Sequence, residues 1–339
     1  MKQTFRIVAG LGLALSLATG AFASNMTGAG SSFIYPLMSK WSYEYSKVKG
    51  VQVNYQSVGS GAGIQQLLNH TVDFGASDAP MTTEMMSKAK GPILHFPMTM
   101  GAVVVTYNVD GISTGLKLDA NTLASIFLGE ITHWNDPAIA KLNPEMTTLP
   151  DTAITIVHRS DGSGTTNIFT DYLTKVSTRW AGTVGKGTAV KWPVGVGGKG
   201  NEAVAGLVRK LPGSIGYVEL AYVLQNKMNY ALIKNRAGKY PEPSIESTSS
   251  AADGAMAKMP ADFRVSFTNA SGAGSYPICG FTWVLAYQNA ANAEQGKTLV
   301  DFLNWAVTDG QAMAPDLHYA PLPAPLVEKI QAAIKTIKF

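Results

Sequence analysis

Four short segments of this chain combine small residues, mostly glycine, with hydroxyl residues directly before a predicted helix. They are Thr27–Phe33, Gly59–Gly63, Ala76–Pro80 and Arg159–Thr165. The first amides of a helix lack partners within it, and glycine lets a ligand approach the backbone closely. Hydroxyl groups beside such amides suit a small anion, because the positive end of the helix dipole points at it. One such segment is common as a helix cap, but four together, one with an arginine, predict an oxyanion pocket.

Another glycine-rich run, 195–200, fits the G-x-G-x-x-G pattern of dinucleotide sites and also precedes a predicted helix. Glu219 lies near the spacing expected of a ribose-binding acid. However, Lys191–Pro193 is a poor buried strand, and no complete βαβ unit surrounds the run. We therefore interpret 195–200 as a structural turn that caps the following helix.

Signs of catalysis are few. Ser163 lies in Gly-Ser-Gly, but the G-x-S-x-G pattern with its triad partners in order is absent. None of the 5 histidines has HExxH or i, i+4 metal spacing. His95 and His133 are expected to be surface or packing residues.

Short β-type runs alternate with helical patterns along the chain, which predicts an α/β architecture. The predicted strands are Val51–Val58, Asp73–Ala76, Ala102–Asn108, Ala153–Arg159 and Cys279–Tyr287. The predicted helices are Pro36–Lys47, Ala62–Leu68, Asn121–Leu128, Thr165–Val176, Asn201–Leu211, Glu294–Trp305 and Pro325–Ile337. Tyr240–Ala257 is predicted as an irregular insertion whose Ala-rich half could form a helix.

The two most apolar predicted strands, Ala102–Asn108 and Cys279–Tyr287, bracket the middle of the chain. If both cross between lobes, the N- and C-terminal parts form one discontinuous unit and the middle forms another. We therefore predict one lobe from residues 24–102 and 283–339, and a second lobe from residues 103–282.

The composition excludes partners that are bound mainly through a large net charge of the protein. Charged residues make up 15% of 339 residues, below the roughly 25% of an average soluble protein, and the net charge is +4. This excludes a polybasic nucleic-acid binder and an acidic disordered chain. The single cysteine, Cys279, excludes an intramolecular disulfide and a Cys-built zinc site. Since it lies in an apolar run, it is expected to be a small buried hydrophobe.

Residues 1–23 are typical of a cleavable export signal. Lys2 and Arg6 precede an apolar stretch, and Ala21-Phe22-Ala23 forms an A-x-A cleavage site. The apolar stretch is shorter than the roughly 20 residues that span a bilayer. Removing Lys2 and Arg6 leaves 25 basic against 23 acidic residues, a net charge of +2. No cysteine follows the cleavage site for a lipid anchor, so we expect a periplasmic location.

Val72–Pro80 and Arg159–Thr165 resemble the signature segments of periplasmic phosphate-binding proteins, the substrate-binding components of ABC-type phosphate importers. The resemblance covers essentially the whole mature chain and includes Thr27–Phe33, Trp192–Asn201, Leu211–Glu219 and Tyr319–Pro323. It implies a two-lobed type II fold, each lobe a mixed sheet flanked by helices, with a hinge that closes the lobes on one dehydrated phosphate. It further implies a monomer that delivers phosphate to an inner-membrane ABC permease, without a cofactor and without catalysis.

The same resemblance assigns the ligand contacts. The first lobe would contribute Ser32, the Phe33 amide, Ser60 and Asp78, and the second lobe Arg159, Ser163, the Gly164 amide and Thr165. Asp161 resembles the acid of the family that pairs with the binding arginine. Two positions depart from the family pattern: Ser32, where relatives often have Thr, and His158, where close relatives can have a second Arg. The hydroxyl of Ser32 preserves the contact, whereas no role follows for His158.

The chemistry of these residues agrees with the implied ligand. The planar guanidinium of Arg159 can donate to two phosphate oxygens. An ionised Asp78 only accepts hydrogen bonds, and both HPO₄²⁻ and H₂PO₄⁻ carry an O–H to donate. Sulfate has no such proton and would meet Asp78 oxygen to oxygen, at a cost of several kcal/mol when buried. The open alternatives are another tetrahedral oxyanion such as sulfate, an exported phosphatase with Ser163 as nucleophile, and a secreted adhesion or scaffold protein.

Overall fold

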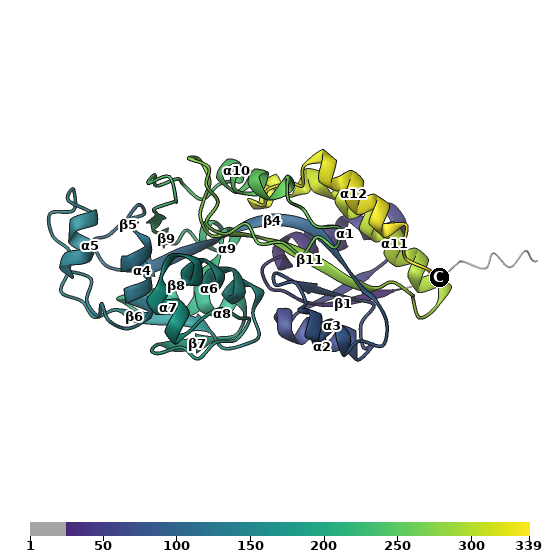
Figure 1. Ribbon diagram of the computed structural model, residues 1–339, viewed down its shortest axis with the longest axis horizontal. Helices are drawn as coiled ribbons and strands as arrows, with labels where there is room; N and C mark the ends of the chain where they lie inside the picture. The colour runs from purple at the N-terminus through teal and green to yellow at the C-terminus, as the bar shows by residue number, and fades with distance from the viewer. Residues whose placement is uncertain (1–24) are drawn as a thin grey trace, which may run out of the picture.

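The computed structural model describes residues 25–339, and the predicted signal, 1–23, lies outside them. Two mixed α/β lobes occupy the two ends of the long axis (Figure 1). The first lobe holds the N-terminal strands and the C-terminal helices, and the second lobe holds the middle of the chain. The predicted α/β, two-lobed class is confirmed.

A single path of hydrogen-bonded strands runs through both lobes in the order β2-β1-β3-β11-β4-β8-β6-β7. These strands are β1 Met26–Gly30, β2 Val53–Ser57, β3 Phe74–Ser77, β4 Ile93–Asn108, β6 Thr155–Arg159, β7 Val196–Gly198, β8 Ser214–Glu219 and β11 Cys279–Tyr287. Off this path, β9 (Asn229–Tyr230) pairs with β4, and β5 (Lys117–Leu118) pairs with β10 (Leu232–Ile233). The parallel pairs lie within each lobe, and antiparallel pairing joins the lobes.

Strand β4 is the element that the lobes share. Its first part, Ile93–Ala102, pairs with β11, and its second part, Val103–Asn108, pairs with β8. The sequence predicted only Ala102–Asn108, and Pro97, which lacks an N–H, is unusual in a central strand. In the structure Pro97 pairs with Trp283 where the register of β11 shifts, so the strand continues through the proline.

Helices cover both lobes, and several of them begin a few residues after a strand ends. They are α1 Tyr35–Lys49, α2 Ser60–Leu68, α3 Thr83–Ser87, α4 Ala120–Phe127, α5 Pro137–Leu142, α6 Gly164–Val176, α7 Thr178–Thr183, α8 Gly200–Lys210, α9 Leu220–Gln225, α10 Ile245–Met256, α11 Ala293–Val307 and α12 Ala324–Ile334. The predicted helices all exist, with ends that differ by a few residues. Most of the predicted irregular insertion is α10, which a capping box of Ser244 and Ser247 starts.

Close packing explains why the sequence missed β1. A Cβ atom at Gly28 would overlap the ring of Phe74 on β3, so this position of β1 needs glycine rather than a typical strand residue. Phe74 in turn contacts Tyr55 and Phe302 within the first lobe. Cys279 is fully buried, as predicted, and burial raises the pKa of its thiol to about 12.

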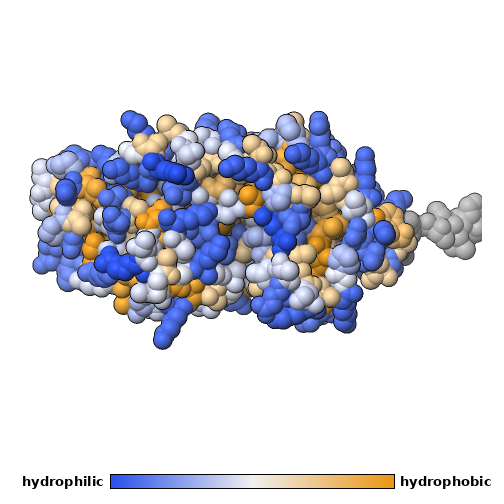
Figure 2. Space-filling model, in the orientation of Figure 1, coloured by the Kyte–Doolittle hydropathy of each residue, from blue (hydrophilic) through white to orange (hydrophobic). Residues whose placement is uncertain are grey.

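The surface carries no large apolar face in the view of Figure 2, where apolar residues are scattered among hydrophilic ones over both lobes. Among residues 25–339, no helix combines the length and the apolar character that crossing a bilayer requires.

Candidate functional site

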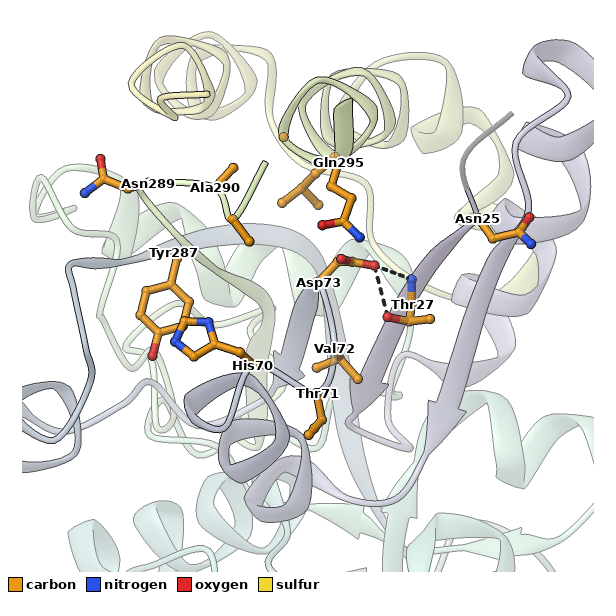
Figure 3. A pocket seen from close by; sticks show the side chains of 13 residues that line it. Asn25, Thr27, His70, Thr71, Val72, Asp73, Tyr287, Asn289, Ala290 and Gln295 are labelled. Carbon is orange, nitrogen blue, oxygen red and sulfur yellow. Dashed lines mark hydrogen bonds between the residues drawn. The ribbon is translucent and has the colours of Figure 1, made fainter. Parts of the chain in front are cut away.

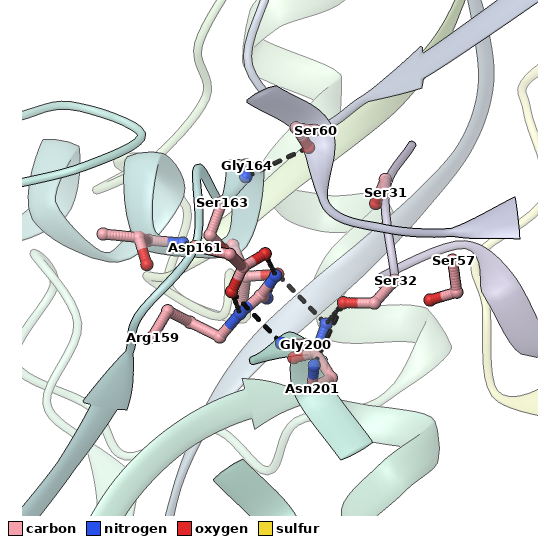
Figure 4. A network of polar contacts seen from close by, with 12 residues as sticks. Ser31, Ser32, Ser57, Ser60, Arg159, Asp161, Ser163, Gly164, Gly200 and Asn201 are labelled. Carbon is pink, nitrogen blue, oxygen red and sulfur yellow. Dashed lines mark hydrogen bonds and ion pairs between the residues drawn. The ribbon is translucent and has the colours of Figure 1, made fainter. Parts of the chain in front are cut away.

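Three of the predicted binding segments, those of Ser32, Ser60 and Arg159, meet between the two lobes in Figure 4, and a hydrogen bond from the Asp78 amide to Ser60 Oγ joins the fourth segment to them. Each of the predicted contact residues is buried: Ser32, Phe33, Ser60, Asp78, Arg159, Ser163, Gly164 and Thr165. Helices α1 and α2 of the first lobe and α6 and α8 of the second begin here, and their first turns are linked by hydrogen bonds. Four positive helix ends therefore converge on one place, which favours an anion.

The two lobes touch through hydroxyl and backbone groups. The hydroxyl of Ser60 accepts from the amide of Asp78 (3.3 Å) in its own lobe and from the amide of Gly164 (3.0 Å) in the other. The amide of Gly61 donates to the carbonyl of Gly162 (2.8 Å). A Cβ atom at Gly164 would lie 2.5 Å from Asp78 Oδ2, so the lobes could not approach this closely with any larger residue.

Arg159 uses one edge of its guanidinium for Asp161 and keeps the other for the site. Its Nε and Nη2 donate to the two carboxylate oxygens of Asp161 at 2.7 and 2.6 Å. Burial by itself would raise the pKa of Asp161, but the Arg159 guanidinium holds it below its usual value. Nη1 donates to Thr165 Oγ1 at 3.3 Å, on the edge that remains for an oxyanion. Asp161 thus orients the guanidinium of Arg159.

Asp78 is a fully buried carboxylate at the end of β3. Its Oδ1 accepts from the hydroxyls of Ser31 and Thr282. Burial raises the pKa of Asp78 to about 6, while these two hydrogen bonds and the charge of Arg159 act in the opposite direction. At neutral pH Asp78 is therefore predominantly an acceptor without a proton.

Ser163 and Phe33 also have partners within the protein. The hydroxyl of Ser163 caps α6 by accepting from the Thr166 amide (3.0 Å), which leaves its own proton available to a ligand. The amide of Phe33 donates to Ser31 Oγ (2.9 Å).

Asn201 is the main contact residue that sequence reasoning missed. Its backbone amide and its side-chain nitrogen both donate to Ser32 Oγ, at 3.0 and 2.9 Å, and the side chain also donates to Thr165 Oγ1 at 3.2 Å. Its own Oδ1 accepts from the Glu219 amide, which fixes the orientation of the side chain. Its sequence signals were its place directly after the run 195–200 and its inclusion in the resembling segment Trp192–Asn201. The prediction of a turn at 195–200 is wrong for Val196–Gly198, which form strand β7 because they pair in parallel with β6, but the run does lead directly into α8.

The histidines do not supply a base for Ser163. In the described chain, the one hydrogen bond of Ser163 Oγ is the helix cap. His158 is nearest in sequence, but its ring stacks on Trp192 and its Nδ1 lies 3.0 Å from the Arg159 carbonyl. His95 is buried and accepts from the Met81 amide, and burial lowers its pKa to about 4. These contacts argue against a Ser163 nucleophile.

A separate cavity of about 300 Å³ lies in the first lobe near the start of β1 (Figure 3). Asp73 projects into it and accepts from the amide and the hydroxyl of Thr27, at 2.7 and 3.0 Å. Among residues 25–339, no lysine or arginine lines this cavity. A carboxylate without a basic partner repels an anion, so this cavity is less suited to an oxyanion than the place between the lobes.

Two α/β lobes that enclose a polar, anion-favouring cradle define a solute-binding protein, and residues 17–309 match the PBP superfamily domain. The chain is 50% identical over 308 residues to phosphate-binding protein PstS of Xylella fastidiosa, covering 91% of this chain and 84% of that protein. It is 49% identical over 315 residues to PstS of Pasteurella multocida, covering 93% and 91%. The chain belongs to the PstS family of phosphate-binding proteins.

Solved structures share the fold. A phosphate-bound, high-affinity periplasmic phosphate-binding protein aligns with a TM-score of 0.70 at 21% identity, covering 91% of this chain and 93% of that one. A phosphate-binding protein from Stenotrophomonas maltophilia aligns with a TM-score of 0.69 at 20% identity, covering 91% and 94%.

Proposed function

We propose that this protein binds one inorganic phosphate ion between its lobes in the periplasm and delivers it to an inner-membrane ABC permease, without catalysis. Membership of the PstS family supports the ligand and the transport role. The proposal includes export by the signal at 1–23, a monomer, and no nucleic-acid partner. The lobes are 24–102 with 283–339 and 103–282, and they close by bending where β4 changes partner between Ala102 and Val103.

The charges of the site between the lobes support an anion that carries a proton. Arg159 is balanced by Asp161, and Asp78 adds a second carboxylate, so side chains alone would leave the site with net negative charge. The stabilisation of phosphate therefore depends on helix N-termini and hydroxyl donors together with the free Arg159 edge. Asp78 accepts the P–O–H of phosphate and repels the bare oxygens of sulfate. The buried Asp78 is the single observation that carries the choice of phosphate.

Hydrogen bonds between the lobes support a closed state that ligand contacts reinforce. One is the bond from the Gly164 amide to Ser60 Oγ described above. In addition, Ser57 Oγ donates to Glu202 Oε1 (3.0 Å), and Tyr222 OH donates to the Ser32 carbonyl (2.6 Å). Phosphate that bridges Ser32 and Arg159 adds charge-assisted bonds to this set. Opening then has to break both kinds of contact, which slows release.

Isothermal titration of phosphate-stripped protein tests the function. We expect tight 1:1 binding of phosphate and no heat with sulfate at pH 7.5. Arg159→Ala should abolish tight binding, whereas Arg179→Ala, which removes a half-exposed surface arginine paired with Glu130, should not. Absence of phosphate binding by the stripped wild-type protein would refute the proposal, and turnover of a phosphate ester that Ser163→Ala removes would support the phosphatase instead.

A further inference from the structure

The two oxygens of the Asp78 carboxylate have different surroundings. Oδ1 accepts from Ser31 Oγ and, at 2.7 Å, from Thr282 Oγ1. Both of these bonds end on Oδ1, whereas Oδ2 faces the first residue of α6, Gly164, in the other lobe, and the Ser60 side chain also acts on the carboxylate. One oxygen is therefore saturated with two donors, and the other is directed into the site.

The sheet register builds this arrangement from three neighbouring strands. Gly30 pairs with Ala76, so Ser31 follows β1 beside the end of β3. Trp283 pairs antiparallel with Ser77, so Thr282 comes opposite Asp78. Because the register fixes both neighbours, the two hydroxyls are held at Oδ1 by backbone pairing as well as by their own bonds.

We propose that Ser31 and Thr282 are positioning residues that determine anion specificity: by occupying Oδ1 of Asp78, they keep Oδ2 as an acceptor reserved for the O–H of a protonated oxyanion. The proposal rests on the proposed phosphate-binding function. It assigns the selectivity for phosphate over sulfate to the pair of hydroxyls as well as to the carboxylate. Without them the carboxylate could rotate, or take up a proton and become a donor that sulfate accepts.

The charges around Asp78 agree with this role. Burial raises the pKa of Asp78 to about 6, and the hydrogen bonds from Ser31 and Thr282 are the largest influences that lower it, ahead of the Arg159 charge and Ser60. The other ionisable groups that face Asp78 are Tyr55, Glu219 and Tyr319. Burial raises the pKa of all three, which disfavours a further negative charge beside Asp78. The hydroxyls therefore help to keep Asp78 ionised at neutral pH.

The test compares Thr282→Val, which keeps the shape and removes the hydroxyl, with Thr282→Ser, which keeps the hydroxyl. Phosphate and sulfate affinities are measured by titration of stripped protein between pH 5.5 and 8.5. We expect Thr282→Val to lower the ratio of phosphate to sulfate affinity by about 10- to 100-fold, the factor carried by one hydrogen bond to a charged group. In Thr282→Val this ratio should also begin to fall at a higher pH than in the wild-type protein. Thr282→Ser should have the wild-type affinity ratio and the wild-type pH dependence.

Thr99→Val is the matched control. Thr99 pairs directly with Thr282 across β4 and β11, is equally buried, and its hydroxyl has no partner among the described residues. We expect wild-type selectivity and pH dependence from it. An equal loss in Thr99→Val and Thr282→Val would assign the effect to repacking and overturn the proposal.

Ser31→Ala is a second, independent variant for the case that Thr282→Val does not fold. It removes the other donor to Oδ1 and should lower the same ratio and shift the pH profile in the same direction. Wild-type selectivity in Ser31→Ala or in folded Thr282→Val would overturn the proposal while phosphate binding stands. Failure of the wild-type protein to bind phosphate would instead refute the proposed function.

Discussion

Replacing Asp78 by asparagine should stabilise the ligand-free protein in a way that depends on pH. The carboxylate is 2% exposed, and burial raises its pKa from 3.8 to about 6. Ionising it in the folded state therefore costs about 3 kcal/mol, from about 1.36 kcal/mol per pKa unit. Since the folded pKa is raised, this cost is absent below pH 3.8, grows between pH 3.8 and 6, and is complete above pH 6.

The measured quantity is the free energy of unfolding of phosphate-stripped protein in urea, for wild type and Asp78→Asn, from pH 4 to pH 7.5. We expect the difference between variant and wild type to rise by about 2 kcal/mol across this range, in favour of the variant, because part of the cost is already present at pH 4. Contributions that do not depend on pH, such as the partners of the new amide, cancel in this comparison.

The same variant should lose discrimination between anions. Asparagine retains an oxygen that can accept from Ser31 and Thr282, but places an N–H₂ where Oδ2 faces the site, and this group donates to sulfate. A difference in unfolding free energy that stays constant from pH 4 to pH 7.5 would contradict the buried, ionised Asp78. So would a variant that still excludes sulfate.

Three further substitutions test the site. Arg159→Lys should weaken phosphate binding by about 10- to 100-fold in a titration, because a lysine cannot hold Asp161 and offer a second edge at once; wild-type affinity would contradict this. Gly164→Ala should weaken binding at least as much and raise the radius of gyration with phosphate, because its Cβ would lie 2.5 Å from Asp78 Oδ2; an unchanged radius would refute the steric argument. Glu202→Ala should speed phosphate release a few-fold in stopped flow, because the lobes lose the bond to Ser57; an unchanged rate would exclude this contact from the closed state.

Much of the local structure could be predicted from the sequence, because it depends on neighbours along the chain. Helix α6 begins at Gly164 with Ser163 as its cap, within one residue of the prediction. The strand β11 has the predicted bounds. The failures have tertiary causes: β4 continues through Pro97 because β11 pairs with it, and β1 contains glycine at position 28 because the ring of Phe74 needs the space.

The sequence by itself determined which chemical groups this protein has for an oxyanion: hydroxyls and glycines before helices, one arginine with a nearby acid, and Asp78. These are properties of short segments, and a short segment carries its own residue types and helix start. Only the tertiary structure decided which groups face one another. Thr282 and Asn201 lie 204 and 169 positions from their partners Asp78 and Ser32, so no local pattern could reveal them. Strand register and lobe contact bring them together, and these contacts make the anion-favouring segments into one site with an oriented acceptor.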